Sequence, residues 1–255
     1  MTRRVNVRLA PWVYTAVLLV IWESAVRMFS IPVFVLPPSV IGEAFVDFWG
    51  PIYRNSLFTL STTMIGFGMA VGFGVLLGLA VGWSRSIYAG LYPLMIGFNA
   101  IPKVAVVPIL VLWFGIGFVP AVLTAFLISF FPIVANVATG LATIEPELED
   151  VLKGLGASKL DIMRKVGIPR TLPYFFGSLK VAITLAFVGS VISESIASNN
   201  GIGNLMLQAQ AQFKVPLIFA SLVALAIEGI VMYWVMALLE NNLTRWAQRS
   251  GFAQT

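Results

Sequence analysis

Two stretches of this sequence carry no charged residue, and their length limits what the chain can fold into. They cover residues 56–84 and 104–144. A helix needs roughly 20 apolar residues to cross the hydrocarbon core of a bilayer, so each stretch can hold at least one crossing. Charged residues make up only 11% of the chain. Soluble domains contain about 25%, so this chain has too few to cover a water-facing surface. The sequence therefore predicts an all-α polytopic membrane protein.

The sequence contains no cysteine and no histidine. Their absence excludes disulfides, thiolate nucleophiles, cysteine-ligated metal centres and Ser-His-Asp catalysis. The net charge of +5 could point to nucleic acid, but in a membrane protein a basic excess more often reflects Lys and Arg kept on the cytoplasmic side. We therefore expect the lipid bilayer as the surroundings of the chain, and no catalytic site, metal site or nucleic-acid partner.

The apolar runs predict about six transmembrane helices within a single domain that covers residues 1–255. We place the spans at residues 9–30, 57–83, 87–114, 119–141, 173–197 and 216–239. With the N-terminus inside, 11 of the 16 basic residues lie on the cytoplasmic side. These are Arg3, Arg4, Arg8, Arg85, Lys153, Lys159, Arg164, Lys165, Arg170, Arg245 and Arg249. The positive-inside rule therefore places both termini in the cytoplasm, together with the loop at residues 143–171.

The first span has an alternative interpretation, because basic residues followed by an apolar run also begin a secretory signal. The run is longer than the apolar part of such a signal, and no small-x-small cleavage site precedes Glu23. We therefore expect an uncleaved membrane anchor.

The second and third spans carry distinctive patterns of glycine and proline. Glycines at positions 74, 78 and 82 lie on one helix face, where small residues let two helices approach closely. This pattern predicts helix packing within the chain, with a contact between subunits as the alternative. Prolines at positions 93, 102 and 108 each remove a backbone donor, so they predict a bent or interrupted third span.

Residues 143–171 form the most highly charged part of the chain, and a loop of this length without a function is uncommon. Pro146 suits the first position of a short helix that Gly154 and Gly156 end. Ser158 is a plausible N-cap for a second helix, with Asp161 in a capping-box arrangement.

The second loop helix would present Leu160, Met163 and Val166 on one side and would end at Gly167 and Pro169. A small apolar ridge of this kind can insert into a groove on a partner protein. The alternative is a loop packed against its own spans, and the spacing does not decide between the two.

The loop resembles the EAA loop of the membrane-spanning subunits of bacterial ABC importers, through residues 150–158 and the pair Ile168 and Pro169. Residues 36–39, 101–108, 112–117 and 201–203 are similar to motifs of the nitrate/sulfonate/taurine branch, in consistent order. At the acidic-Ala-Ala triplet of the family this chain has Asp150, Val151 and Leu152, which keeps the charge and enlarges the two small residues. The resemblance implies the type I ABC importer transmembrane-domain fold and a place in the bacterial cytoplasmic (inner) membrane.

The resemblance also implies that the chain is a permease subunit that functions in a complex with other subunits. Two permease copies would form the pathway, two ATPase subunits would bind ATP and Mg²⁺ on the cytoplasmic side, and an extracytoplasmic solute-binding protein would deliver the solute. The sequence has no G-x-x-x-x-G-K-[ST] phosphate loop, so we expect a transport subunit without a cofactor of its own and not an enzyme. The residues that would couple to the ATPase are Asp150, Leu155, Gly156, Ala157, Ser158, Lys159 and Pro169.

Charged side chains inside spans are costly and usually face a cavity or the interior of a helix bundle. Lys103 lies deep in the third span and is the candidate to attract a small anionic solute, such as a sulfonate, taurine or nitrate. Alternatively, Lys103 snorkels to the interface or pairs with Glu194 or Glu228.

Three further polar residues are pathway candidates. Glu194 and Ser193 lie toward the outer end of the fifth span and could form a gate, although Glu194 could equally satisfy neighbouring backbone groups. For Asn136, helix packing is the alternative to a place on the pathway.

An ion-gradient-driven secondary transporter or channel is the alternative function, since embedded Glu and Lys can serve as charge relays. Such folds often contain paired broken helices in internal repeats, and the 102–108 segment has no second copy. An intramembrane enzyme would need a carboxylate pair or a Ser-Lys dyad, and no span shows one at convincing spacing. Relatives of similar appearance carry taurine, alkanesulfonates, nitrate, bicarbonate, riboflavin or pyrimidine precursors of thiamine, so the sequence leaves the solute open.

Overall fold

The computed structural model describes residues 10–28 and 35–244, and within these ranges every regular element is a helix. The basic residues predicted at positions 3, 4, 8, 245 and 249 lie outside the described ranges. In chain order the elements are α1 (Ala10–Met28), α2 (Pro38–Asp47), α3 (Trp49–Gly82), α4 (Arg85–Ala100), η1 (Lys103–Val106), α5 (Val107–Phe114), α6 (Phe118–Ala142), α7 (Pro146–Gly154), α8 (Lys159–Ile162), η2 (Met163–Gly167), α9 (Ile168–Ala197), α10 (Ile202–Ala211) and α11 (Val215–Leu243).

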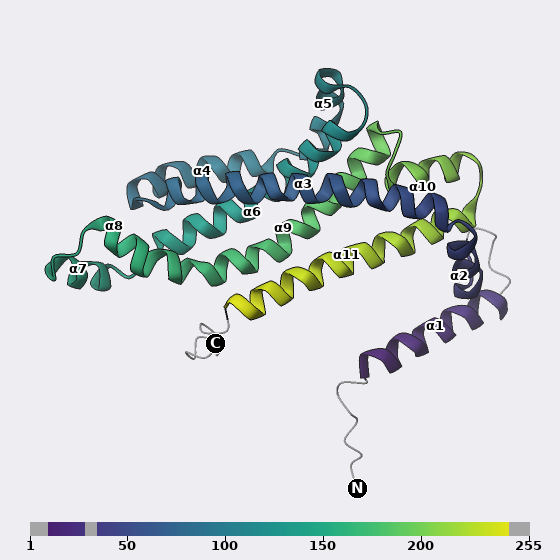
Figure 1. Ribbon diagram of the computed structural model, residues 1–255, viewed down its shortest axis with the longest axis horizontal. Coiled ribbons are helices and arrows are strands. Elements are labelled where there is room, and N and C mark those ends of the chain that lie inside the picture. The colour runs from purple at the N-terminus through teal and green to yellow at the C-terminus, as the bar shows by residue number, and fades with distance from the viewer. Residues whose placement is uncertain (1–9, 29–34, 245–255) are drawn as a thin grey trace, which may run out of the picture.

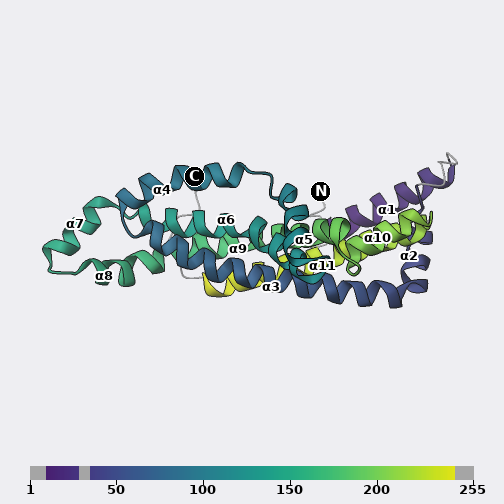
Figure 2. The same ribbon diagram turned by 90° about the horizontal axis from the view of Figure 1, so that it is seen from above.

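The long helices α3, α6 and α9 lie side by side and form the centre of the bundle (Figure 1). The closest packing joins α6 to α3 on one side and to α9 on the other. At one end of the bundle lie the short loop helices α7 and α8, and at the opposite end lie α2 and α10 (Figures 1 and 2). The charged loop and the α9–α10 connection are therefore far apart.

Glycines hold α3 close to α6. A Cβ atom at Gly74 would lie 2.8 Å from a side-chain carbon of Ile133, and one at Gly78 would lie 2.7 Å from Val137. At Gly82 the corresponding contact is with Leu141. These distances are too short for any larger side chain, so the predicted packing within the chain is confirmed.

Four helices are long and apolar enough to cross a membrane, and a bent pair can provide a fifth. The four are Trp49–Gly82, Phe118–Ala142, Lys159–Ala197 and Val215–Leu243. The bent pair joins Arg85–Ala100 to Lys103–Phe114 at an angle of 72°, which confirms the interrupted third span predicted from its prolines. The predicted first span coincides with α1, but α1 is not among the helices that meet this test.

One predicted helix end is wrong. Gly167 and Pro169 do not end the second loop helix, because α8, η2 and α9 run on as one helix from Lys159 to Ala197. The π-helical turn η2 directly precedes Pro169, and Pro169 itself lies in the first turn of α9. A proline is tolerated there because the first turn of a helix does not need its missing N–H. The loop and the α9 span therefore form one continuous element.

Candidate functional site

The loop at residues 143–171 turns sharply at Gly156. The Gly156 N–H donates to the Lys153 carbonyl (2.9 Å), and the Ala157 N–H donates to the Leu152 carbonyl (3.0 Å). This pair of bonds is a Schellman motif, which requires a left-handed residue where the helix ends. Gly156 has φ +85°, a conformation that side-chain-bearing residues rarely adopt. The predicted break between the two loop helices is confirmed.

A capping box starts the second loop helix. The Asp161 N–H donates to the Ser158 hydroxyl oxygen (3.2 Å), and the Asp161 carboxylate accepts from the Ser158 N–H (3.3 Å). The Ser158 hydroxyl also donates to the Asp161 carboxylate, and this bond, followed by the bond from the Ser158 N–H, holds the pKa of Asp161 below its ordinary value. The predicted cap is therefore confirmed, and the turn between Gly156 and Ser158 has a defined geometry.

The loop is fastened to the bundle at its base. Arg85, at the start of α4, donates to the Ile144 carbonyl (3.1 Å). Arg170, in the first turn of α9, pairs with Glu145 (3.1 Å). Met163 is buried in the main hydrophobic core. The inner face of the loop thus packs against its own spans.

Three large apolar side chains of the loop are exposed among its charged residues. Val151 is 60% exposed, Leu155 79% and Leu160 64%, and we call these three residues the exposed loop patch. The predicted ridge of Leu160, Met163 and Val166 is wrong, because Met163 faces the bundle while Leu160 faces outward. Of the two interpretations that the spacing left open, packing against the chain's own spans applies to Met163, and insertion into a partner stays a prediction.

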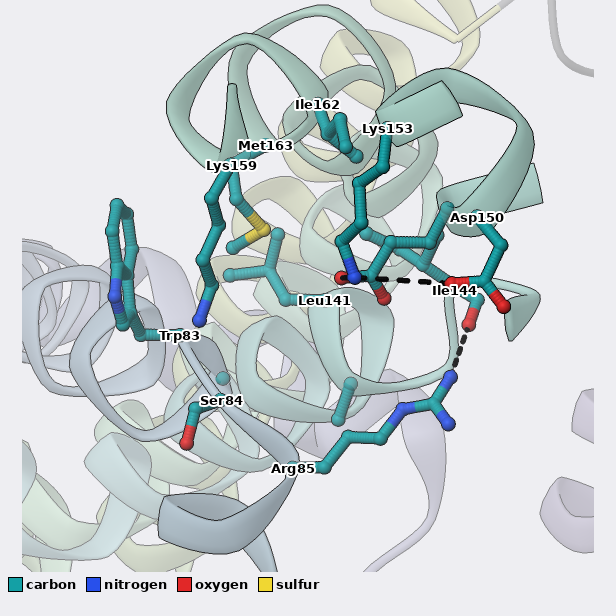
Figure 3. A pocket seen from close by; sticks show the side chains of 13 residues that line it. Trp83, Ser84, Arg85, Leu141, Ile144, Asp150, Lys153, Lys159, Ile162 and Met163 are labelled. Carbon is teal, nitrogen blue, oxygen red and sulfur yellow. Dashed lines mark hydrogen bonds and ion pairs between the residues drawn. The ribbon is translucent and has the colours of Figure 1, made fainter. Parts of the chain in front are cut away.

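Polar side chains of the loop line a cavity of about 310 Å³ against the ends of α3, α4 and α6 (Figure 3). The Lys153 ammonium lies 2.9 Å from Glu149 and 3.9 Å from Asp150. The hydrogen bond from Lys153 holds the pKa of Glu149 below its ordinary value, and the charges of Arg85 and Lys159 act in the same direction. The cavity therefore contains a mixed charge cluster.

The structure divides the predicted coupling residues between the tip and the base of the loop. Leu155, Gly156 and Asp150 are exposed. Lys159 is also exposed, but its ammonium lies 5.4 Å from the centre of the Trp83 ring, so it points back toward α3 (Figure 3). The half-buried Ala157 follows the turn, and Pro169 lies in the first turn of the α9 segment of the continuous helix.

Lys103 lies at the bend between α4 and α5. Its ammonium donates to the Asn99 carbonyl and to the Asn99 side-chain oxygen, both at 2.8 Å. Its partner is therefore Asn99, and neither Glu194 nor Glu228 pairs with it. Lys103 stays partly exposed at this bend.

Glu194 is fully buried and collects hydrogen bonds from three elements. Its carboxylate accepts from Thr59 (2.8 Å) and Thr62 (3.3 Å) of α3 and from Ser190 (3.1 Å) of α9. It also accepts from the Gly203 N–H at the start of α10 (3.2 Å). Glu194 thus satisfies one backbone N–H and three side-chain hydroxyls, and its role as a gate stays a prediction.

Side chains from other helices cap α10. The Gly201 N–H donates to the Asn55 side-chain oxygen (2.8 Å), and the Ile202 N–H donates to the Thr59 hydroxyl (3.0 Å). Together with the bond from Gly203 to Glu194, three N–H groups at the start of α10 find partners on α3 and α9. Helix starts leave such groups unsatisfied unless a side chain or water provides an acceptor. Sequence analysis singled out Glu194 but missed Asn55 and Thr59, whose only signal was polarity near the outer end of an apolar span.

The two remaining pathway candidates differ in exposure. Ser193 is fully buried, and its hydroxyl has no hydrogen-bond partner in the described part of the chain. Asn136 donates to the Pro132 carbonyl (2.8 Å) and lines a cavity of about 390 Å³ with Tyr174 and Ser178 of α9. Asn136 therefore lines an open cavity, whereas Ser193 and Glu194 are buried.

Sequence analysis also missed an ion pair between two helices. The Lys180 ammonium of α9 lies 2.5 Å from the Glu240 carboxylate of α11. Both residues carry charges in apolar segments, but they are 60 positions apart in the sequence, so nothing local linked them. The pair joins α11 to the helix that continues from the loop.

Comparison with known proteins gives one consistent family. Residues 70–249 match the family described as binding-protein-dependent transport system inner membrane component. A formylaminopyrimidine transport permease of Halalkalibacterium halodurans is 31% identical over 94% of this chain and 97% of its own length. A riboflavin transport system permease of Chloroflexus aurantiacus is 35% identical over 90% of this chain and 87% of its own. A taurine transport system permease of Escherichia coli is 26% identical over 91% of this chain and 87% of its own length.

The fold is also that of a solved structure. The methionine ABC transporter MetNI, in an inward-facing conformation, contains a chain that superposes with a TM-score of 0.66. The match covers 77% of this chain and 97% of the other, at 18% sequence identity. At this identity the similarity concerns the fold alone.

Proposed function

We propose a transport function from one premise: this chain belongs to the family of binding-protein-dependent transport system inner membrane components, the permease subunits of ABC importers. Membership of the branch that includes the taurine and sulfonate permeases is confirmed, as is the all-α type I importer transmembrane fold. The chain is an integral inner-membrane protein. It is a transport subunit and not an enzyme, because ATPase activity in this family lies in separate subunits.

In this proposal two copies of the chain form the translocation pathway, and two ATPase subunits with ATP and Mg²⁺ bind the loop from the cytoplasm. An extracytoplasmic solute-binding protein delivers the solute at the opposite end, and both termini lie in the cytoplasm. The excess of basic residues on the loop side supports this orientation.

The observation that carries the proposal is the structure of the loop, which joins exposed apolar side chains to a long helix of the bundle. Its exposed loop patch of Val151, Leu155 and Leu160 offers an apolar surface to a partner. Behind the patch, one uninterrupted helix runs from Lys159 to Ala197 through the bundle. A partner that moves the tip would therefore move α9 with it, and ATP binding would supply the difference in stability between two orientations of the pathway.

The proposed role is tested by reconstitution. We expect an ATPase subunit to co-purify with the chain in detergent, and uptake into liposomes to require that subunit, the solute-binding protein and ATP. Uptake by the chain alone, driven by an ion gradient without ATP, would instead support the secondary-transporter alternative and reject the proposal.

We further propose that the solute is small and anionic and that Lys103 contacts it, with Asn136 beside the pathway. Support for Lys103 is its position at the bend, where an ammonium is held by Asn99 yet remains partly exposed. Glu194 and Ser193 would act from inside the protein, by fixing α10 and α9 beside the pathway. The second candidate is a heteroaromatic solute, since the permeases that are 31% and 35% identical carry formylaminopyrimidine and riboflavin in their names.

Lys103→Ala should raise the KM for an anionic solute such as taurine, because the charged hydrogen bond to the solute is lost. A hydrogen bond to a charged group contributes about 1.5–3 kcal/mol, so we expect KM to rise at least about tenfold. Lys214→Ala, which removes an exposed cation before α11, is the matched control and should leave KM unchanged. An unchanged KM in Lys103→Ala, with riboflavin transported instead of taurine, would favour the heteroaromatic candidate.

A further inference from the structure

The cavity beneath the loop has a charge pattern that the predicted coupling residues explain only in part, since Asp150 and Lys159 belong to both sets. Three cations line it: Arg85 from the start of α4, Lys153 from α7 and Lys159 from α8. Figure 3 shows all three side chains directed into the cavity. The two carboxylates on its wall, Glu149 and Asp150, both lie next to Lys153.

In the described part of the chain the other two cations form no direct ion pair, although the charges of both act on Glu149. Among residues 10–28 and 35–244, neither Arg85 nor Lys159 forms an ion pair. Arg85 uses one nitrogen on the Ile144 carbonyl, which leaves its other N–H groups available. The Lys159 ammonium faces the Trp83 ring. The cavity thus has unused capacity to bind an anion.

The position of the cavity indicates which anion can reach it. Trp83 stands at the end of the charge-free stretch 56–84, directly after α3, and it is 42% exposed. Tryptophan at the end of an apolar span is typical of the membrane–water interface. The rest of the wall contains apolar side chains, among them Leu141 and Met163. The cavity therefore joins a cationic part to an apolar part at the level of lipid headgroups.

We propose that this cavity binds the phosphate group of an anionic phospholipid headgroup between Arg85 and Lys159, with Trp83 beside it. Arg presents several N–H donors in a planar fork that matches a phosphate, and Lys adds a compact charge. Basic pockets between membrane helices on the cytoplasmic side bind anionic headgroups elsewhere. The headgroup would connect the start of α4 to the start of α8, and so brace the loop against the bundle.

The proposal requires only that the chain is in a membrane, so it can fail while the proposed transport function stands. The observations favour a lipid over an acidic side chain of the ATPase, because the ends of α3 and α6 contribute to the cavity wall and no residue of the exposed loop patch does.

The test is a titration of the purified full-length chain with phosphatidylglycerol or phosphatidylcholine, with bound lipid counted by native mass spectrometry. Each cation near an anionic membrane surface contributes about 1 kcal/mol, so Lys159→Gln and Arg85→Gln should each weaken phosphatidylglycerol binding about fivefold. Arg164→Gln is the matched control, since Arg164 is an exposed cation of the same loop that does not line the cavity. Its affinity should equal that of the wild type.

Because Arg85 also supports the loop through Ile144, Lys159→Gln is the deciding variant. Equal phosphatidylglycerol affinity in Lys159→Gln and Arg164→Gln would overturn the proposal. Displacement of the lipid by millimolar inorganic phosphate would overturn the lipid assignment in favour of a soluble phosphate ligand. If Lys159→Gln binds lipid normally but no longer co-purifies with the ATPase subunit, the lipid proposal is overturned, and Lys159 contacts the ATPase instead.

Discussion

Gly156→Asp is expected to abolish ATP-driven uptake while the chain remains folded in the membrane. Gly156 adopts φ +85° at an exposed turn between the two loop helices. Most residues other than glycine are strained by about 1–2 kcal/mol in the left-handed conformation, Asp and Asn less than the rest, and the two bonds of the Schellman motif depend on that conformation. The new carboxylate would also enter the proposed interface with the ATPase beside Leu155. A loss of 1.4 kcal/mol in that contact reduces its equilibrium constant tenfold, so uptake should fall by about tenfold or more.

The comparison with Gly156→Asn separates charge from backbone geometry. Asparagine has nearly the same size as aspartate, tolerates the left-handed conformation and carries no charge. No other atom lies within 4 Å of a Cβ built on Gly156, so neither variant collides within the chain itself. We expect Gly156→Asn to retain part of the uptake and of the bound ATPase. If Gly156→Asp takes up solute at the wild-type rate, with equal amounts of the two proteins in the membrane, this turn does not couple transport to the ATPase subunit.

Sequence analysis succeeded where the deciding contacts are local. Gly156, Ser158 and Asp161 lie within six residues, and each has a conformational preference that acts on its nearest neighbours. The glycine repeat of α3 likewise predicted a close helix contact, although not that α6 is the partner. In the same way, Pro102 and Pro108 predicted an interruption but not its angle, which packing determines.

Sequence analysis failed where contacts with distant segments of the chain determine which side chains are buried or hydrogen-bonded. Met163 and Leu160 were assigned to one face, but Met163 is buried in the core and Leu160 is 64% exposed, and local periodicity does not predict which side of the helix is buried. The acceptors that cap α10 come from Asn55 and Thr59, which are 146 and 143 positions away from their donors. A fully buried carboxylate in an apolar span indicates a polar partner, but it does not identify one.

Gly201→Ala is expected to cost about 3 kcal/mol of stability, because it disturbs both the backbone and the buried carboxylate. Gly201 has φ +96°, and a Cβ atom there would collide with the carboxylate of Glu194. Glu194 would have to move away from Thr59 and from the Gly203 N–H, which leaves buried polar groups without partners. The measurement is the thermal unfolding midpoint of the purified chain in detergent.

Gly115→Ala isolates the backbone part of this cost. Gly115 also has a left-handed conformation, with φ +76°, but no other atom lies within 4 Å of a Cβ built there. We expect Gly115→Ala to lower the stability only by the backbone strain of about 1–2 kcal/mol. The collision itself is measured in a Glu194→Ala background, where Gly201→Ala should cost no more than Gly115→Ala does, since coupled residues give non-additive changes. An equal cost of Gly201→Ala in both backgrounds would mean that Glu194 does not pack against Gly201, and that α10 is held in place by Asn55 and Thr59 alone.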